Sequence, residues 1–432
     1  MVYVLDKNGQ PLMPTNRHGK VKHLLDDGKA KVIRKCPFTI KLLYDVPGYV
    51  QYMEPDGMDT GSGAFGTAVI NQKNEVVYMS EVTVRNDIKR KMDRRRKYRR
   101  TRRSRKTRYR AKRFRNRRTS RRVNRLSPTM VSKLNSHEKE LRFIRKSLPI
   151  KRTTEPILET GNFDPHLMKN PALADPKVRI WGYQQGPNYG YQNTRQMVLA
   201  RDKHKCQLCK GKSKCAQLEV HHIVFRSVGG SDEPENLITL CKDCHKDLHA
   251  DKIETKLKGK KMSSLKHATQ MNIIRSQLMK NHPNATETKG YITQENRYLI
   301  GLPKGHAFDA CVIASGGKPV TFLTDVIYIK RDIAKGDYRQ TNGAHSEKKI
   351  PTGKVDGFRK FDKVEYFGEE YFIKGRRFEG SAAGTVELMY INGDKVDFSD
   401  KPKGFKTPKI ENCKRISARK SQLITTKKLP KV

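Results

Sequence analysis

Two Cys-x-x-Cys pairs stand near the middle of this 432-residue chain, Cys206 with Cys209 and Cys241 with Cys244. Zinc takes four sulfur ligands in a tetrahedron, and each pair can form one tight knuckle of such a site. The four cysteines therefore predict one structural Zn²⁺ ion. By themselves they also fit a plain zinc ribbon that has no catalytic role.

Histidines and an asparagine accompany these cysteines. His221 and His222 are adjacent, Asn236 follows them, and His245 and His249 lie four residues apart after the last cysteine. Because residues i and i+4 share one face of a helix, the last two histidines can bind one ion together. The combination resembles the HNH endonuclease family, which has a ββα-metal site. It makes the plain zinc ribbon the weaker alternative.

The HNH resemblance implies a role for each of these side chains. In that family the second His of the pair is the general base that activates water. The first His and the helical histidines bind a divalent ion, and the Asn holds the local geometry. The resemblance thus implies His222 as the base, His221 and His245 as Mg²⁺ ligands with His249 as a further candidate, and Asn236 as the support.

The charge of the chain indicates a polyanionic partner. Its formal net charge is +47, from 91 Lys and Arg against 44 Asp and Glu. A surface so positive repels itself unless a polyanion lies against it, so a nucleic acid is expected, bound in a salt-dependent way. No apolar run approaches the ~20 residues of a membrane-spanning helix. The first residues show no signal-peptide pattern, so we expect no membrane partner.

The other four cysteines lie outside the paired motif, at Cys36, Cys215, Cys311 and Cys413. We expect plain thiols at these positions, because they show no disulfide framework. This usage of cysteine fits a reducing cytoplasm.

Residues 1–50 predict a small mixed unit. Strands are expected at Val2–Leu5 and Phe38–Tyr44, and a helix over Val21–Asp27. Between them, Pro11–Thr15 reads Pro-Leu-Met-Pro-Thr, which on physical grounds predicts only a Pro-bounded loop. The same pentapeptide gives its name to the N-terminal PLMP domain of the IscB family, and the chain resembles that family here. IscB proteins are transposon-encoded, RNA-guided nucleases.

Lysines and arginines make up more than half of residues 89–125, and Asp93 is the one acid among them. A helix is predicted because Pro and Gly are absent, yet like charges at i+3 and i+4 repel. Such a helix needs phosphates around it; the alternative is a disordered basic tail, although the segment is internal. It resembles the bridge helix of IscB proteins, which implies contact with guide RNA. The arginines in question are Arg94, Arg95, Arg96, Arg99, Arg100, Arg102, Arg103, Arg105, Arg110 and Arg113.

Three acidic motifs resemble the parts of a RuvC nuclease site, which has an RNase H-like fold. Asp59 precedes Gly61 and a predicted strand pair, Glu159 ends a short apolar strand, and His306 with Asp309 share a helix face. The resemblance implies Mg²⁺ bound by Asp59, Glu159 and Asp309 for a two-metal cut, with His306 assisting. Each motif alone is common in turns or at strand ends. The polar stretch before Asp59 contains Pro55, which indicates a short strand or a weakened site.

The combined resemblance implies an α/β multidomain chain. Its RNase H-like RuvC core would be split by an Arg-rich bridge helix and a ββα-metal HNH insertion, with small N-terminal PLMP and C-terminal β-rich domains. The expected order is a PLMP domain at 1–50, RuvC-I at 51–88, the bridge helix at 89–126, RuvC-II at 127–165, a linker at 166–194, the HNH domain at 195–260, RuvC-III at 261–318, and a β-rich basic domain at 319–432 that contacts the target-adjacent motif.

Three functions follow as hypotheses. The first is an RNA-guided DNA endonuclease in the cytoplasm, at the prokaryotic nucleoid, with one chain per omega-type guide RNA. Its HNH site would cut the guide-paired strand of a double-stranded DNA target and its RuvC site the displaced strand. The second is a stand-alone HNH homing or nicking endonuclease with a degenerate RuvC scaffold. The third is a non-enzymatic RNA-binding protein, which would leave His221, His222 and Asn236 without a purpose.

Overall fold

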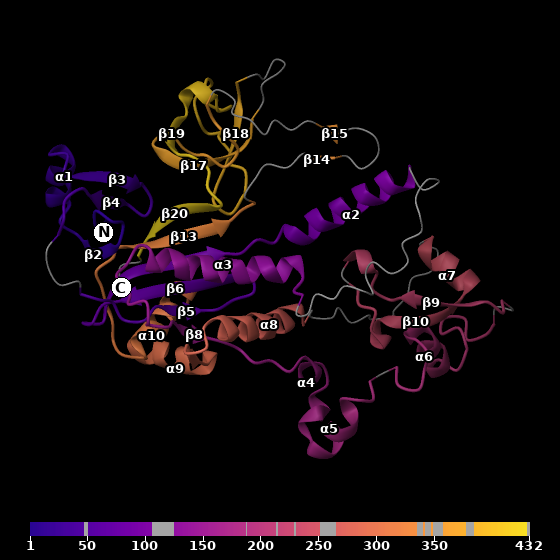
Figure 1. Cartoon of the computed structure of the whole chain (residues 1–432). Coiled ribbons are helices and arrows are strands. Elements are labelled where there is room, and N and C mark those ends of the chain that lie inside the picture. The colour runs from indigo at the N-terminus through magenta and orange to yellow at the C-terminus, as the bar shows by residue number, and fades with distance from the viewer. Residues whose placement is uncertain are drawn as a thin grey trace. The chain divides into compact units, whose positions relative to one another are not determined.

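The computed structural model in Figure 1 describes most of the chain. Two compact units are present: Met1–Asn162 with Gln270–Val432, and Phe163–Thr269, which is inserted between the two parts of the first. The described residues are 1–46, 51–105, 125–186, 188–212, 215–228, 230–250, 265–334, 340–341, 347–348, 357–376 and 384–429.

A mixed sheet forms the centre of the first unit, in the order β11-β8-β5-β6-β7-β13-β20, with β12 beside β7. Strands β5, β6 and β7 form an antiparallel meander, whereas β8 runs parallel to β5 and β11 parallel to β8. The bounds are β5 Gly57–Asp59, β6 Ala64–Ile70, β7 Glu75–Thr83, β8 Ile157–Glu159, β11 Thr286–Thr288, β12 Thr321–Phe322, β13 Val326–Asp332 and β20 Gln422–Lys428.

Helices cover both faces of this sheet. In β6, Ala68 and Ile70 face the cluster built on α10, while Phe65 and Val69 pack with residues of α3. Successive strand residues point to opposite faces, so both sets can be buried only if both faces are covered. Figure 1 shows α3 and α10 on opposite sides of the sheet. The helices are α3 Pro128–Arg145, α8 Lys266–Asn281, α9 Gly290–Ile300 and α10 His306–Ser315.

Two glycines allow α10 to lie directly on the strands. A Cβ atom at Gly66 would come within 1.9 Å of the His306 carbonyl oxygen, and one at Gly57 within 2.5 Å of the Ala310 oxygen. Only residues without a side chain permit this approach. The glycines therefore set the distance between α10 and the ends of β5 and β6.

The N-terminal sheet has the order β2-β1-β4-β3 and carries α1. The predicted loop at Pro11–Thr15 is instead strand β2, antiparallel to β1. Proline is tolerated there because β2 is an edge strand. The bounds are β1 Val2–Leu5, α1 His18–Asp26, β3 Ala30–Arg34 and β4 Thr39–Leu42.

The described strands of the C-terminal part are divided among three sheets, of which β14 and β15 form a small antiparallel pair. A separate four-stranded sheet has the order β18-β17-β16-β19, consistent with the predicted β-rich unit. Strands β12, β13 and β20, however, belong to the central sheet, so the expected boundary at residue 319 does not separate two sheets. The remaining bounds are β14 Gln340–Thr341, β15 Glu347–Lys348, β16 Lys363–Tyr366, β17 Glu369–Arg376, β18 Val386–Met389, η5 Ile410–Asn412 and β19 Lys414–Ser417.

The second unit contains a β-hairpin followed by a helix. Strands β9 and β10 pair antiparallel, with His221 opposite Ile238, and α7 begins directly after β10. The segment expected as a linker forms short helices, each preceded by a capping Asp or Asn and started by Pro. The bounds are α4 Pro165–Lys169, η2 Pro171–Ala174, α5 Pro176–Gly182, α6 Thr194–Arg201, β9 Leu218–His222, η3 Arg226–Val228, η4 Pro234–Asn236, β10 Leu237–Cys241 and α7 Lys242–His249.

The first part of the basic run forms helix α2, Ile88–Ser104, in which only Ile88 is buried. The predicted RNA contacts within α2 are exposed, and Asp87 at its start pairs with Arg85 and Lys91. Arg110 and Arg113 lie outside the described residues. None of the helices among the described residues is both long enough and apolar enough to cross a membrane.

Candidate nuclease sites

The acidic residues of the first unit meet at the ends of β5 and β8. Asp59 and Glu159 are register partners on these parallel strands, and Asp59 faces Gly66 on its other side. His306, the first residue of α10, places Nδ1 2.5 Å from the Asp59 carboxylate. That hydrogen bond raises the pKa of His306.

Asp309 lies one turn further along α10 and pairs with a buried arginine. Its Oδ1 is 2.8 Å from Nε of Arg297, which is 5% exposed. Burial, followed by the nearby Asp59 charge, raises the pKa of Asp309. Burial, with smaller effects of Asp59 and Asp309, raises the pKa of Glu159 to about 7. Neighbouring carboxyl groups whose pKa values are raised by burial and by one another's charge indicate a place where a bound cation would be stabilised.

Oxygen donors of this kind suit Mg²⁺. Within the described residues, however, the three carboxylates do not form a group whose ligand atoms all lie within 4.8 Å of one another, whereas two other groups do. The structure thus brings Asp59, Glu159, His306 and Asp309 into one neighbourhood without closing them into a compact ligand set.

The first compact group is the cysteine site, with Cys206, Cys209, Cys241 and Cys244. The Sγ atoms of Cys209 and Cys241 are 3.8 Å apart. Zn–S bonds of about 2.3 Å in a tetrahedron place sulfurs at about this separation. Burial and the neighbouring thiols raise the pKa of Cys244, so four thiolates need a cation between them. The residues fit Zn²⁺.

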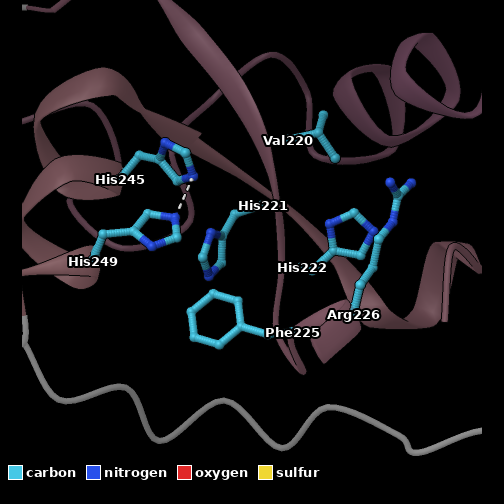
Figure 2. Close-up of a pocket in the computed structure, with 7 residues that line it drawn as sticks. All are labelled: Val220, His221, His222, Phe225, Arg226, His245 and His249. Atoms are coloured by element: carbon cyan, nitrogen blue, oxygen red, sulfur yellow. Dashed lines mark hydrogen bonds between the residues drawn. The ribbon is translucent and has the colours of Figure 1, made fainter. Parts of the chain in front are cut away.

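The second group consists of His221 on β9 and His245 and His249 on α7. Nε2 of His245 lies 3.2 Å from Nε2 of His249, as the dashed line in Figure 2 marks. Burial and the adjacent imidazoles lower the pKa of His221 to about 4, which keeps its ring neutral and able to bind a metal. Nδ1 of His245 is held 2.5 Å from Glu219, so that Nε2 is left for an ion.

Three imidazoles form a softer ligand set than Mg²⁺ prefers. Imidazole suits zinc, nickel and similar transition ions, whereas Mg²⁺ favours carboxylate and water oxygens. The geometry fits a divalent ion, but its chemistry favours a transition metal over the Mg²⁺ expected from the sequence.

His222 lines the same pocket from the other side of β9. Figure 2 shows the His222 and Arg226 side chains across the strand from the three clustered rings. Nε2 of His222 lies 2.8 Å from Oδ1 of Asp232, and the Arg226 guanidinium contacts the same oxygen at 2.6 Å. The carboxylate fixes the imidazole orientation, which leaves Nδ1 as the nitrogen that can accept a proton.

Asn236 is completely buried and does not reach the pocket. Its Oδ1 accepts from the Val224 amide at 2.9 Å, and its Nδ2 donates to the carbonyls of Val224 and Ser231. These bonds fix the backbone of the loop between His222 and Asp232. Asn236 therefore supports the site indirectly, by holding this loop in place.

Comparisons with known proteins agree with this geometry. Residues 206–251 match the family model described as HNH endonuclease, and residues 2–186 match that of the RRXRR protein. Residues 206–251 are an HNH endonuclease domain. An RRXRR match followed by an HNH domain is consistent with the IscB-like family, and the HNH domain makes the chain an enzyme of the nuclease class.

One curated relative shares part of the chain. The type IV methyl-directed restriction enzyme EcoKMcrA of Escherichia coli (strain K12) is 31% identical over 87 residues. This stretch covers 18% of the present chain and 25% of the relative. The similarity therefore concerns about a quarter of that enzyme.

Several neighbours of the candidate residues, in each of the two units, were not predicted from the sequence. Asp232 and Glu219 orient His222 and His245, and in the first unit Arg297 pairs with Asp309. Glu81, opposite Gly66 on β7, accepts a 3.3 Å hydrogen bond from the Ala307 amide at the start of α10. Glu219 lies two residues before the His pair on the same strand face as His221, a signal that could have identified it.

Proposed function

We propose that this protein is an RNA-guided endonuclease that cuts both strands of a DNA target. The observation that carries the proposal is the presence of two unlike nuclease-type sites in one strongly basic chain: an imidazole cluster beside His222 and a carboxylate neighbourhood beside His306. Two antiparallel strands present their scissile phosphates in opposite directions, so two sites suit them better than one.

In the HNH domain, the residues divide the work of phosphodiester hydrolysis. A divalent ion bound by His221, His245 and His249 would stabilise the negative charge on the phosphate. His222, oriented by Asp232, accepts the proton of the attacking water at Nδ1. The water oxygen bonds to phosphorus as the bond to the leaving sugar oxygen breaks. Arg226 adds a positive charge at the pocket edge for the substrate phosphate.

The central sheet supports an RNase H-like interpretation of the other site. Its three-strand meander is extended by two parallel strands, and acidic residues stand on the first and fourth of these five strands and on α10. Asp59, Glu159 and Asp309 would hold Mg²⁺, and His306 would exchange a proton with the attacking water or the leaving oxygen. In the proposed division, this site cuts the displaced strand and the HNH site the guide-paired strand.

The exposed face of α2 supports a guide RNA as the partner. Its arginines project to solvent on several sides, and a folded RNA can surround a helix in a way that a straight DNA duplex cannot. Base pairing by the guide would then select the DNA sequence while the protein binds phosphates.

Two single substitutions test the division of labour. His222→Ala should cut only the displaced strand, and Asp59→Ala only the guide-paired strand, as read from strand-specific end labels on a plasmid target. His204→Asn is a matched control for the HNH variant, because this exposed His has a φ of 52°, which Asn tolerates. It should retain both cuts.

A second candidate function is a stand-alone HNH homing or nicking enzyme. Strand β5 is only three residues long and Asp309 is paired with Arg297, both of which suit a weakened acidic site. This alternative gains if Asp59→Ala still produces double-strand breaks. It gains also if the RNA-free protein cuts one fixed sequence.

A further inference from the structure

Helix α9 forms one wall of the acidic site. The Thr293 side chain lies beside that of Glu159, and a Cβ atom at Gly290 would lie 3.0 Å from the Glu159 Oε1 atom. Arg297, one turn after Thr293, binds Asp309. Gly290, Thr293 and Arg297 recur at the three- and four-residue spacing of one helix face, and Thr293 and Arg297 are buried.

The opposite face of α9 carries large side chains that are exposed. Tyr291 and Tyr298 are 70% and 67% exposed, whereas Leu299, which is 79% exposed, is turned about 100° around the helix from Tyr298 and lies off their face. The two tyrosines are seven residues apart, so they lie on the same face about 10 Å from each other. Exposed tyrosine rings on a helix that borders the acidic site suit a partner with flat apolar surfaces.

The Tyr298 ring is linked to the acidic site by its neighbour. The guanidinium of Arg297 lies 4.8 Å from the centre of this ring while its Nε contacts Asp309. A cation against one aromatic face fixes the ring and leaves the remainder exposed. Tyr298 therefore has a defined position relative to Asp309.

We propose that the exposed face of α9, centred on Tyr298, is a base-stacking platform for single-stranded DNA entering the acidic site. The proposal rests on the proposed nuclease function of that site. The platform extends that function by assigning the residues that bind the unpaired strand. Stacking on tyrosine accepts any base, as a nuclease directed by a guide requires.

Charge on α9 and at its ends agrees with a nucleic acid rather than an apolar peptide as the occupant. Lys304 follows the helix with an exposed side chain, and Lys289 precedes it, half-buried and ion-paired with Glu287 at 3.3 Å, in a chain of net charge +47. Glu295 lies on one flank of the tyrosines and Gln294 on the other, beside Arg297. The phosphates are therefore expected on the Gln294 flank, with the bases turned toward Tyr298.

The test uses the full chain with its co-purified RNA and a target that this RNA specifies. The displaced strand carries a single 2-aminopurine, moved one position at a time across the cut site, and Ca²⁺ replaces Mg²⁺ during binding. Stacking on Tyr298 should quench the fluorescence at one or two positions. Tyr298→Phe should keep the quenching and Tyr298→Ala should lose it. Leu299→Ala is the matched control and should keep it, because Leu299 is also exposed but points away from the face that carries the two tyrosines.

Cleavage in Mg²⁺ gives a second readout. Tyr298→Ala should slow cutting of the displaced strand about tenfold, the effect of losing one stacked base, and leave the HNH cut unchanged. An abasic sugar at the quenched position should slow the wild-type protein and have no further effect on Tyr298→Ala.

Equal quenching and rates in the wild type and Tyr298→Ala would overturn the platform, as would an equal loss in Leu299→Ala. Failure of the nuclease proposal is distinguishable, because the binding signal needs no cleavage. If the acidic site is not a nuclease site, Asp59→Ala will still cut both strands, whatever the fluorescence of the bound strand shows.

Discussion

The negative charge of Glu159 in the acidic site lowers the stability of the fold. Its pKa is raised from 4.5 to about 7, chiefly by burial. Because the folded-state pKa lies above the unfolded value, ionising Glu159 destabilises the protein. This cost is absent below pH 4.5, grows between pH 4.5 and 7, and is complete above about pH 7.

Replacing Glu159 by Gln should therefore stabilise the Mg²⁺-free protein at pH 8, because the amide carries no charge. Since the side chain is partly exposed, solvent screening limits the expected gain to on the order of 1 kcal/mol. The gain should disappear at pH 4.5, which serves as the internal control in thermal unfolding. Added Mg²⁺ should stabilise the wild type more than the variant. A variant less stable than the wild type at pH 8 would show that Glu159 makes a net favourable contact.

At the level of single residues, the sequence predicts the metal-binding side chains better than the residues that pair with the candidate site residues. Cys206 to His249 is one continuous stretch with metal-ligand spacing, so both compact groups could be anticipated. Arg297 and Asp232 could not be, because their roles depend on tertiary contacts with Asp309 and His222. No local pattern encodes such pairs.

Gly66 on β6 determines how closely α10 can approach the sheet. It is the register partner of Asp59 on β5 and of Glu81 on β7, so it lies between these two acidic residues. Gly66→Ala would put a methyl group into the backbone of His306, so α10 must move outward. We expect a loss of about 1–3 kcal/mol of stability, the usual cost of overpacking. Displaced-strand cutting should be lost, while the HNH cut persists.

Gly63→Ala is the matched control for this prediction, because a Cβ atom there meets nothing within 4 Å. Chemical denaturation and strand-specific cleavage measure the two effects. Equal behaviour of the two variants would mean that α10 tolerates displacement, and the close approach would then have no role in positioning His306 and Asp309.

Most elements follow from local pattern, and the exceptions have physical causes. The helix at Pro128 begins as expected, with Ser127 accepting from the Met130 amide. The residues after Phe163 are rich in Pro, Gly, Asn and Tyr, which predicts a linker over 166–194. The Asp164-Pro165 and Asp175-Pro176 pairs are in fact helix starts, with Asp as the cap and Pro at the first position.

The central sheet is assembled from distant parts of the chain, which limits prediction at the scale of the whole molecule. Strand β20 returns after the C-terminal sheet to pair with β13 through seven register partners, Val326↔Lys428 to Asp332↔Gln422. Its polar, Lys-rich sequence gave no strand pattern, because one edge position in a large sheet requires little burial. The acidic motifs identified residues that lie on β5, β8 and α10, whereas the edge strand β20 could not be predicted.

The distribution of charge leads to the last prediction, which concerns dependence on RNA. In α2, Arg95, Arg99 and Arg103 follow one another at four-residue spacing and are all exposed, and only Ile88 of the helix is buried. Like charges at this spacing repel, so the free protein pays electrostatic energy that bound phosphates would remove. We expect the RNA-free protein to be poorly soluble at low salt and inactive on plasmid DNA.

Adding the co-purified RNA back should restore cutting at the sites that this RNA can pair with, and RNase treatment should abolish it. Changing the pairing segment of the RNA should move the cut to the new complementary sequence. Arg99→Glu with Arg103→Glu should weaken RNA binding and flatten its salt dependence, since two phosphate contacts are lost. Cutting of one fixed sequence by RNA-free protein, unchanged by RNase, would instead identify a homing-type enzyme whose specificity lies in the protein itself.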